Sequence, residues 1–303
     1  MPILSTSVQQ ESLEIGLGDK NKLHLQRFFL KKKLGTPVLM LHGSIENGRI
    51  FYSENRKGLA PYLAAQGYEV YVADLRGRGK SHPKISRHSH FGQTEAICED
   101  LPAFIDEIIR RRGKVKQHWI AHSWGGVLLM SMLARFPKYA PLVKKIVCFG
   151  TKRNVHVQNL DKFLIIDLFW NYTASLLTKV LGYLPAKELK IGSDNETKKF
   201  HHQVRLWVKS GYPWVDSQDG FDYARAIRKI KLPPAYHLTG IADTCLGHPN
   251  DVFAFIQECG SKNYRFKILS KENGNLHDYD HVNILTHPDA VKDHFVDVSR
   301  ALA

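Results

Sequence analysis

Residues 116–136 read KQHWIAHSWGGVLLMSMLARF, and the rest of the chain can be organised around this stretch. A short apolar run that ends at Ala121 leads into a tight turn, and a pair of glycines then opens a strongly apolar helical run. At such a strand–turn–helix junction the central residue, Ser123, adopts a strained backbone conformation and projects its hydroxyl from the sheet edge. Its neighbours two positions away must be small, as Ala121 and Gly125 are. Because free N–H groups at a helix N-terminus favour developing negative charge, the stretch predicts a serine nucleophile.

The turn A-H-S-W-G resembles the nucleophile elbow G-x-S-x-G of the α/β-hydrolase family. Ala121 stands where the family usually has glycine, which adds one methyl group at a point of close packing. Alanine is the next smallest residue, so we expect the elbow to form. A motif of this length also arises by chance, and a serine N-cap on an ordinary helix is the alternative interpretation. Support must therefore come from other parts of the chain.

The composition is typical of a soluble globular protein. Of the 303 residues 43% are hydrophobic and 24% are charged, and the length allows one large core with an insertion. The four cysteines are widely spaced and form no C-x-x-C pair, which favours reduced thiols and a cytoplasmic location. The first residues, MPILSTSVQQESLEIG, lack the basic and apolar segments of a signal peptide, so we expect no secretion.

The chain carries a formal net charge of +14, which attracts anionic surfaces. The basic residues are dispersed apart from the runs 31–33 and 110–112, and no zinc-finger spacing or aromatic nucleic-acid motif accompanies them. We therefore expect no nucleic-acid partner and at most a weak electrostatic association with membrane surfaces. The sequence makes no prediction about the oligomeric state.

Alternating hydrophobic runs predict the architecture. Residues 12–30 predict an antiparallel hairpin at the edge of a sheet. Apolar runs predict strands at 37–41, 69–73, 119–121, 145–149, 233–239 and 264–269. Helical spacing predicts helices at 54–66, 94–112, 250–259 and 288–301, besides the helix after the elbow. Strands that alternate with helices predict an α/β fold, with a mostly parallel central sheet flanked by helices.

The alternation breaks after residue 150. Residues 151–232 are rich in apolar, aromatic and basic side chains, and polar residues such as Asp167 and Lys179 interrupt the apolar run, which argues against a membrane span. We expect residues 151–232 to form a helical cap or lid, and residues 1–150 and 233–303 to form the α/β-hydrolase core. A purely structural helical hairpin is the alternative for the inserted segment.

Candidate reactive residues directly follow four of the predicted strands. In open α/β sheets, reacting groups gather at the carboxyl ends of the strands. The four places are His42-Gly43-Ser44, Ser123, Asp243 and the segment 275–281. The chain order of serine, acid and histidine matches that of α/β hydrolases, so the resemblance extends over nearly the whole chain.

The resemblance implies a catalytic triad. Ser123 would be the nucleophile, His281 its general base, and Asp243 the acid that orients the imidazole. His281 lies in D-H-V-N, which resembles the family's D-H-x-[DN] context in lipases and esterases. His277 is the rival candidate for the base, and Asp251 is the rival acid, although its place after Pro249-Asn250 is typical of a helix cap.

The resemblance also implies two backbone donors for the oxyanion of an acyl-transfer reaction. These are the N–H of Trp124, directly after the nucleophile, and the N–H of Ser44, after His42-Gly43. A plain turn at the end of a strand is the alternative interpretation of His42-Gly43.

Two other motifs predict no ligand. Residues 74–81, DLRGRGKS, end like a phosphate loop, but Asp74 stands where that motif needs its first glycine. The stretch instead resembles the D-x-R-G-x-G-x-S turn of the α/β-hydrolase family. No carboxylate or cysteine completes a ligand set around His82, His88 and His90, so we expect no metal and no cofactor.

These features together predict a serine hydrolase that cleaves carboxylic esters through an acyl-enzyme, with an esterase-like or lipase-like preference for a small hydrophobic ester or acyl substrate. Thioester hydrolysis, C–C bond hydrolysis and acyl transfer use the same triad and remain alternatives, as does a binding protein without turnover. Serine at position 123 excludes the usual chemistry of the family's dehalogenases and epoxide hydrolases, which use an aspartate nucleophile.

Overall fold

An eight-stranded sheet runs through the protein in the order β1-β2-β4-β3-β5-β6-β9-β10. The computed structural model describes residues 8–18, 21–31 and 34–303. The strands are β1 (Val8–Gly16), β2 (Lys22–Leu30), β3 (Pro37–Leu41), β4 (Glu69–Asp74), β5 (Gln117–His122), β6 (Val143–Phe149), β9 (Ala235–Gly240) and β10 (Tyr264–Leu269). β2 pairs antiparallel with β1 and β4, and all other neighbours in the sheet are parallel. The predicted edge hairpin and mostly parallel sheet are therefore confirmed.

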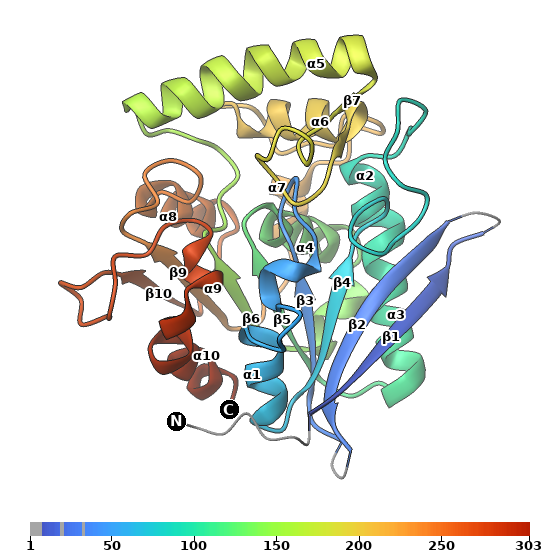
Figure 1. The fold of residues 1–303 in the computed structure, drawn as a ribbon, viewed down its shortest axis with the longest axis vertical. Coiled ribbons are helices and arrows are strands. Elements are labelled where there is room, and N and C mark those ends of the chain that lie inside the picture. The colour runs from blue at the N-terminus through green and yellow to red at the C-terminus, as the bar shows by residue number, and fades with distance from the viewer. Residues whose placement is uncertain (1–7, 19–20, 32–33) are drawn as a thin grey trace.

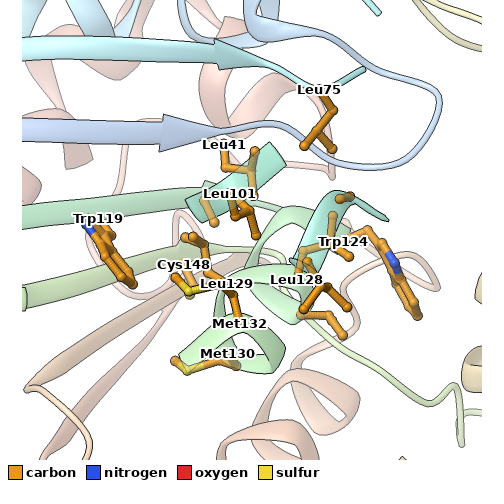
Figure 2. Packing of buried hydrophobic residues seen from close by; sticks show 14 of the residues in the cluster. Leu41, Leu75, Leu101, Trp119, Trp124, Leu128, Leu129, Met130, Met132 and Cys148 are labelled. Carbon is orange, nitrogen blue, oxygen red and sulfur yellow. The ribbon is translucent and has the colours of Figure 1, made fainter. Parts of the chain in front are cut away.

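The central strands are buried on both faces, which is why they read as continuous apolar runs. Successive side chains of a strand point to opposite faces, so Leu39 and Leu41 join one hydrophobic cluster while Val38 and Met40 join the other. Figure 2 shows part of the first cluster, in which residues of α4 pack against side chains of the sheet. Each face of the sheet thus has a core of its own.

Helices cover both faces of the sheet (Figure 1). α1 (Leu59–Ala65) and α10 (His294–Leu302) cover one face, and α3 (Leu101–Arg112) and α4 (Trp124–Arg135) cover the other. α8 (Pro249–Glu258) follows β9 as predicted. The shorter elements are η1 (Gly48–Phe51), α2 (Gln93–Glu95), η2 (Ala96–Asp100), η3 (Pro137–Leu142), α9 (Asn283–Thr286) and η5 (Pro288–Lys292).

Two predicted helices have different boundaries in the structure. The helix expected at 54–66 begins only at Leu59, because Gly58 has a φ of 119°, which is not helical. Pro61 has no N–H to donate, so it is tolerated only in the first turn of a helix. The helix expected at 288–301 is broken at Asp293 into η5 and α10. The Asp293 carboxylate accepts hydrogen bonds from Leu276 N–H and the Tyr279 hydroxyl, both 2.8 to 2.9 Å long, and so fixes the loop after β10.

Most of the regular elements in the segment 151–232 are helices. They are η4 (Lys162–Thr173), α5 (Ala174–Leu181), α6 (Lys198–Val208) and α7 (Tyr223–Ile227), with the short strands β7 (Tyr183–Leu184) and β8 (Glu196–Thr197). Figure 1 shows the long helix of η4 and α5 across the top of the molecule, with α6 beneath it. Among the described residues, no helix is both long and apolar enough to span a membrane.

Candidate active site

Ser123 occupies the turn between β5 and α4, with a φ of 51° and a ψ of −126°. Its N–H donates to the Phe149 carbonyl at 2.8 Å, which ties the turn to the neighbouring strand. Small residues make this conformation possible, because a Cβ at Gly125 would lie 2.5 Å from the His42 carbonyl oxygen. A Cβ at Gly43 would lie 2.8 Å from the Ser123 Cβ. The strained turn therefore depends on glycine in two separate segments.

The structure brings Ser123, His281 and Asp243 together in one line of hydrogen bonds. His281 Nε2 lies 2.8 Å from Ser123 Oγ, and His281 Nδ1 lies 2.5 Å from Asp243 Oδ2. A carboxylate can only accept, so the proton sits on Nδ1 and leaves Nε2 to accept the serine hydroxyl. This arrangement allows His281 to remove the proton of Ser123.

Asp243 is buried, with 3% of its side chain exposed. Its Oδ1 accepts the N–H of Gly247 at 2.8 Å. Burial alone would raise the pKa of this carboxyl, but His281, the Gly247 N–H and Lys152 outweigh it and lower the pKa below its usual value. Asp243 is therefore ionised at neutral pH, as an acid that orients an imidazole must be.

The two rival residues lie in other contacts. His277 Nε2 is 3.0 Å from Asp289 Oδ2, and the ring packs at a tilt against His287 with a centroid distance of 4.1 Å. Among the described residues, His277, His287 and Asp289 form a group that could hold a metal ion, with ligand atoms within 4.8 Å of one another. Asp251 does not cap its own helix but accepts the N–H of His156 at 2.9 Å.

The loop 42–47 follows β3 and carries the predicted oxyanion donor Ser44. Neither the Ser44 N–H nor the Trp124 N–H donates to another described residue. The Ser44 hydroxyl instead donates to Glu196 Oε2 at 3.0 Å. His42 holds the start of the loop in place, because its Nδ1 contacts the Gly43 carbonyl at 2.8 Å and its Nε2 accepts the Leu75 N–H at 3.2 Å. Both backbone donors are thus available, one in the loop 42–47 and the other at the start of α4.

Sequence reasoning missed the contact between Glu46 and the fully buried His122. His122 Nδ1 lies 2.8 Å from Glu46 Oε2, although the residues are 76 positions apart. Burial alone would raise the pKa of Glu46, but the charge and hydrogen bond of His122 lower it to about 2. Conversely, burial alone would lower the pKa of His122, and Glu46 raises it above its usual value. The two side chains therefore form an ion pair directly before Ser123 in the chain.

Two acidic residues of the segment 151–232 also hold the loop 42–47, and sequence reasoning missed them too. Glu196 is fully buried, pairs with the Arg78 guanidinium, and accepts the Ser44 hydroxyl. Asp194 Oδ2 accepts from Asn47 Nδ2 at 2.7 Å and from Gly79 N–H at 2.6 Å. No local motif marks these residues, because their partners lie more than 100 positions away.

The turn at residues 74–81 packs around a carboxylate. Asp74 accepts the N–H groups of Gly48 at 2.8 Å and Lys80 at 2.9 Å, and its Oδ2 lies 2.8 Å from His24 Nδ1. A Cβ at Gly79 would lie 2.1 Å from the Asp74 carboxyl carbon. The turn is thus closed on the Asp74 carboxylate, which also holds Gly48 of the loop after β3.

A cavity of about 550 Å³ opens between η1, α1 and the C-terminal elements. Its lining includes Arg49, Lys57, Tyr62 and Phe295. Ser123, Asp243 and His281 do not line it. The hydrogen-bonded line at Ser123, and not this cavity, therefore identifies the candidate active site.

Comparison with known proteins gives an independent view of the chain. Residues 36–210, more than half of the chain, match the family model described as alpha/beta hydrolase fold. Lipase 1 of Drosophila melanogaster is 29% identical over 307 residues, which cover 80% of this chain and 67% of that protein. Bifunctional epoxide hydrolase 2 of Sus scrofa is 30% identical over 112 residues, which cover 36% of this chain and 18% of that protein.

A soluble variant of monoglyceride lipase from Saccharomyces cerevisiae, solved with a substrate analog, has the same fold. Its TM-score is 0.68 at 17% identity, and the match covers 100% of this chain and 97% of that chain. The chain spans about two thirds of the Drosophila relative and less than one fifth of the porcine one. With its mostly parallel sheet, its serine elbow and the matching family model, the chain belongs to the alpha/beta hydrolase fold family.

Proposed function

We propose that the protein is a serine hydrolase that cleaves carboxylic esters. The observation that carries the proposal is the line of hydrogen bonds from Ser123 through His281 to Asp243, at a turn in which the serine has a φ of 51°. A serine hydroxyl is scarcely ionised at neutral pH, so attack on a carbonyl needs a base within hydrogen-bonding reach. The similarity to Lipase 1 of Drosophila melanogaster supports the same reaction class.

The reaction proceeds in two steps. Ser123 Oγ attacks the ester carbonyl carbon while its proton passes to His281 Nε2, and the N–H groups of Ser44 and Trp124 stabilise the oxyanion. The C–O bond to the alcohol then breaks as His281 returns the proton to the leaving oxygen, which leaves an acyl-enzyme. Water, deprotonated by His281, hydrolyses this intermediate and releases the acid. Asp243 stabilises the imidazolium in both steps.

The substrate is a small hydrophobic ester. The segment 151–232 contributes the aromatic side chain of Trp207, whose ring centroid lies 6.3 Å from that of Trp124 beside the nucleophile. Apolar surroundings favour an acyl chain at this site. We further propose that residues 151–232 act as a lid, since Gly192 and Ser193 contact Ile45 of the loop 42–47.

An anionic lipid surface is the partner that we propose for the lid. A large apolar side chain is exposed at every fourth position of its long helix: Leu160, Leu164, Leu168, Tyr172, Leu176 and Val180. Apolar patches of this kind mark interaction sites, and the net charge of +14 favours anionic headgroups.

Sedimentation with vesicles tests this partner. We expect binding to vesicles that contain phosphatidylserine and less binding at high salt. The double substitution Leu168→Ser with Tyr172→Ser should weaken binding, whereas Leu34→Ser, also at an exposed position, should not. Equal binding by all three proteins would contradict a role for the helix.

Turnover of p-nitrophenyl esters of graded chain length tests the reaction itself. The wild-type protein should hydrolyse them and react with a fluorophosphonate probe at Ser123, and Ser123→Ala should lose both activities. Turnover that survives the substitution would refute the mechanism. An unlabelled Ser123 without turnover would favour a binding protein, and faster cleavage of matched thioesters would favour a thioesterase.

A further inference from the structure

His122 directly precedes the nucleophile, and its side chain is fully buried. Both of its ring nitrogens face hydrogen-bond acceptors. Nδ1 lies 2.8 Å from Glu46 Oε2, and Nε2 lies 2.8 Å from the carbonyl oxygen of His281. A carbonyl oxygen can only accept, and an ionised carboxylate can only accept, so each nitrogen must carry a proton. The lowered pKa of Glu46, about 2, means that its carboxylate is ionised at neutral pH, so these contacts make His122 an imidazolium.

Glu46 has a second contact, which lies within the loop 42–47 that carries the proposed oxyanion donor. The same Oε2 atom that accepts from His122 also accepts the Gly43 N–H at 2.8 Å. Gly43 lies directly before Ser44, whose N–H is the proposed oxyanion donor. One carboxylate oxygen thus joins the loop 42–47 to the strand that ends at the nucleophile.

We propose that the ion pair of Glu46 and His122 is a positioning unit, which sets the oxyanion loop through Gly43 and the loop of the general base through the His281 carbonyl. The inference rests on the proposed function, because it assigns the pair to the geometry of that reaction. Neither residue touches the reacting atoms. They act through Gly43, which precedes Ser44, and through the backbone carbonyl of His281.

Glutamine at position 46 cannot reproduce the contacts of the carboxylate. If its oxygen takes the place of Oε2, the imidazolium of His122 loses its counter-charge. If its nitrogen takes that place, it opposes the Gly43 N–H, which is a donor as well. Glu46→Gln therefore removes either the counter-charge of His122 or the hydrogen bond from Gly43, while it keeps the shape of the side chain. Small misplacements of reacting groups reduce rates strongly.

The test measures ester turnover and the rate of Ser123 labelling by a fluorophosphonate in Glu46→Gln, in His122→Gln and in the double variant. We expect each single substitution to lower kcat and the labelling rate by about 100-fold, with little change in KM, because the lost contacts serve the transition state. The double variant should lose no more than the worse single variant, since the two residues act as one unit. His277→Gln, at a half-exposed His–Asp pair outside the site, is the matched control and should keep wild-type rates.

Single variants with wild-type rates, or losses that multiply in the double variant, would overturn the inference. The two proposals fail separately. If Ser123→Ala retains turnover, the proposed function fails, and if only the Glu46 and His122 variants behave like wild type, the positioning unit fails. Labelling needs no correct substrate, so the positioning unit is tested even where p-nitrophenyl esters react slowly.

A nitrogen NMR spectrum of the histidine rings gives a readout that needs no active or stable variant at position 46. At a pH of about 6.5, the ordinary histidine pKa, most His122 rings should carry two protonated nitrogens in the wild-type protein, because Glu46 raises the pKa of His122. The signals are assigned by their loss in His122→Gln. A neutral His122 tautomer under these conditions would overturn the inference.

Discussion

The loop 42–47 is held from two sides, and the two sides differ in kind. On the core side, Glu46 contacts His122 of β5, which is the strand that also carries the nucleophile. On the lid side, Asp194 and Glu196 reach the loop from the inserted segment. The contact with His122 joins the loop 42–47 to a strand of the central sheet. The contacts with Asp194 and Glu196 form only where the inserted segment packs on the loop. The position of the loop 42–47 therefore depends both on the core and on the docking of the inserted segment.

The largest expected effect is a loss of activity that distinguishes the proposed base, His281, from the rival candidate His277. His281→Gln should lower kcat by about 10⁴-fold, because Ser123 loses its base. His277→Gln should leave kcat unchanged, because His277 contacts Asp289. Steady-state kinetics with a p-nitrophenyl ester measure both. If His277→Gln were the more damaging substitution, the core-side geometry would be wrong.

A second substitution breaks the lid side alone. Asp194→Ala leaves the partly buried donors of Asn47 and Gly79 without their acceptor, so we expect the free energy of unfolding to fall by about 1–3 kcal/mol. The control is Asp278→Ala, which removes a similar acceptor, of Lys271 N–H, at an exposed position and should have little effect. Urea titration compares the two variants. Equal losses would mean that docking of the lid adds nothing at this loop.

A third prediction concerns the pH dependence of the core-side ion pair. The folded pKa of Glu46 is lowered from 4.5 to about 2, so its stabilising effect is present above 4.5 and is lost as the pH falls toward 2. The folded pKa of His122 is raised above 6.5, so its effect is present below 6.5 and is lost as the pH rises through the raised value. The destabilisation by Glu46→Gln should therefore be greatest between pH 4.5 and 6.5. Unfolding measured across pH tests this, and a constant difference would contradict it.

The smallest expected effect on activity comes from the hydrogen bond between Ser44 of the loop 42–47 and Glu196 of the inserted segment. Ser44→Ala removes the hydroxyl that donates to Glu196 but keeps the backbone N–H that would serve the oxyanion. We expect kcat to fall by less than about tenfold, in keeping with the loss of one hydrogen bond. A far larger loss in steady-state kinetics would show that the side chain, and not the backbone, serves the transition state.

The sequence predicted the strands well because parallel strands buried on both faces leave continuous apolar runs such as Val38 to Leu41. The helix boundaries were less predictable. The positive φ of Gly58 delays the start of α1 to Leu59. The Asp293 carboxylate, which turns toward the loop 275–279, marks the break between η5 and α10. Such contacts depend on neighbours that are remote in the chain.

The sequence by itself determined the order of strands and helices, the elbow at Ser123 and the order of serine, acid and histidine along the chain. These are properties of neighbouring residues, and the carboxyl ends of parallel strands meet at one edge whatever separates them in sequence. Only the tertiary structure decided that His281 rather than His277 faces Ser123, and that Glu46, His122, Asp194 and Glu196 surround the oxyanion loop. The physical reason is that a hydrogen bond depends on the direction of each side chain within an ångström, and that direction follows from packing between segments far apart in the chain.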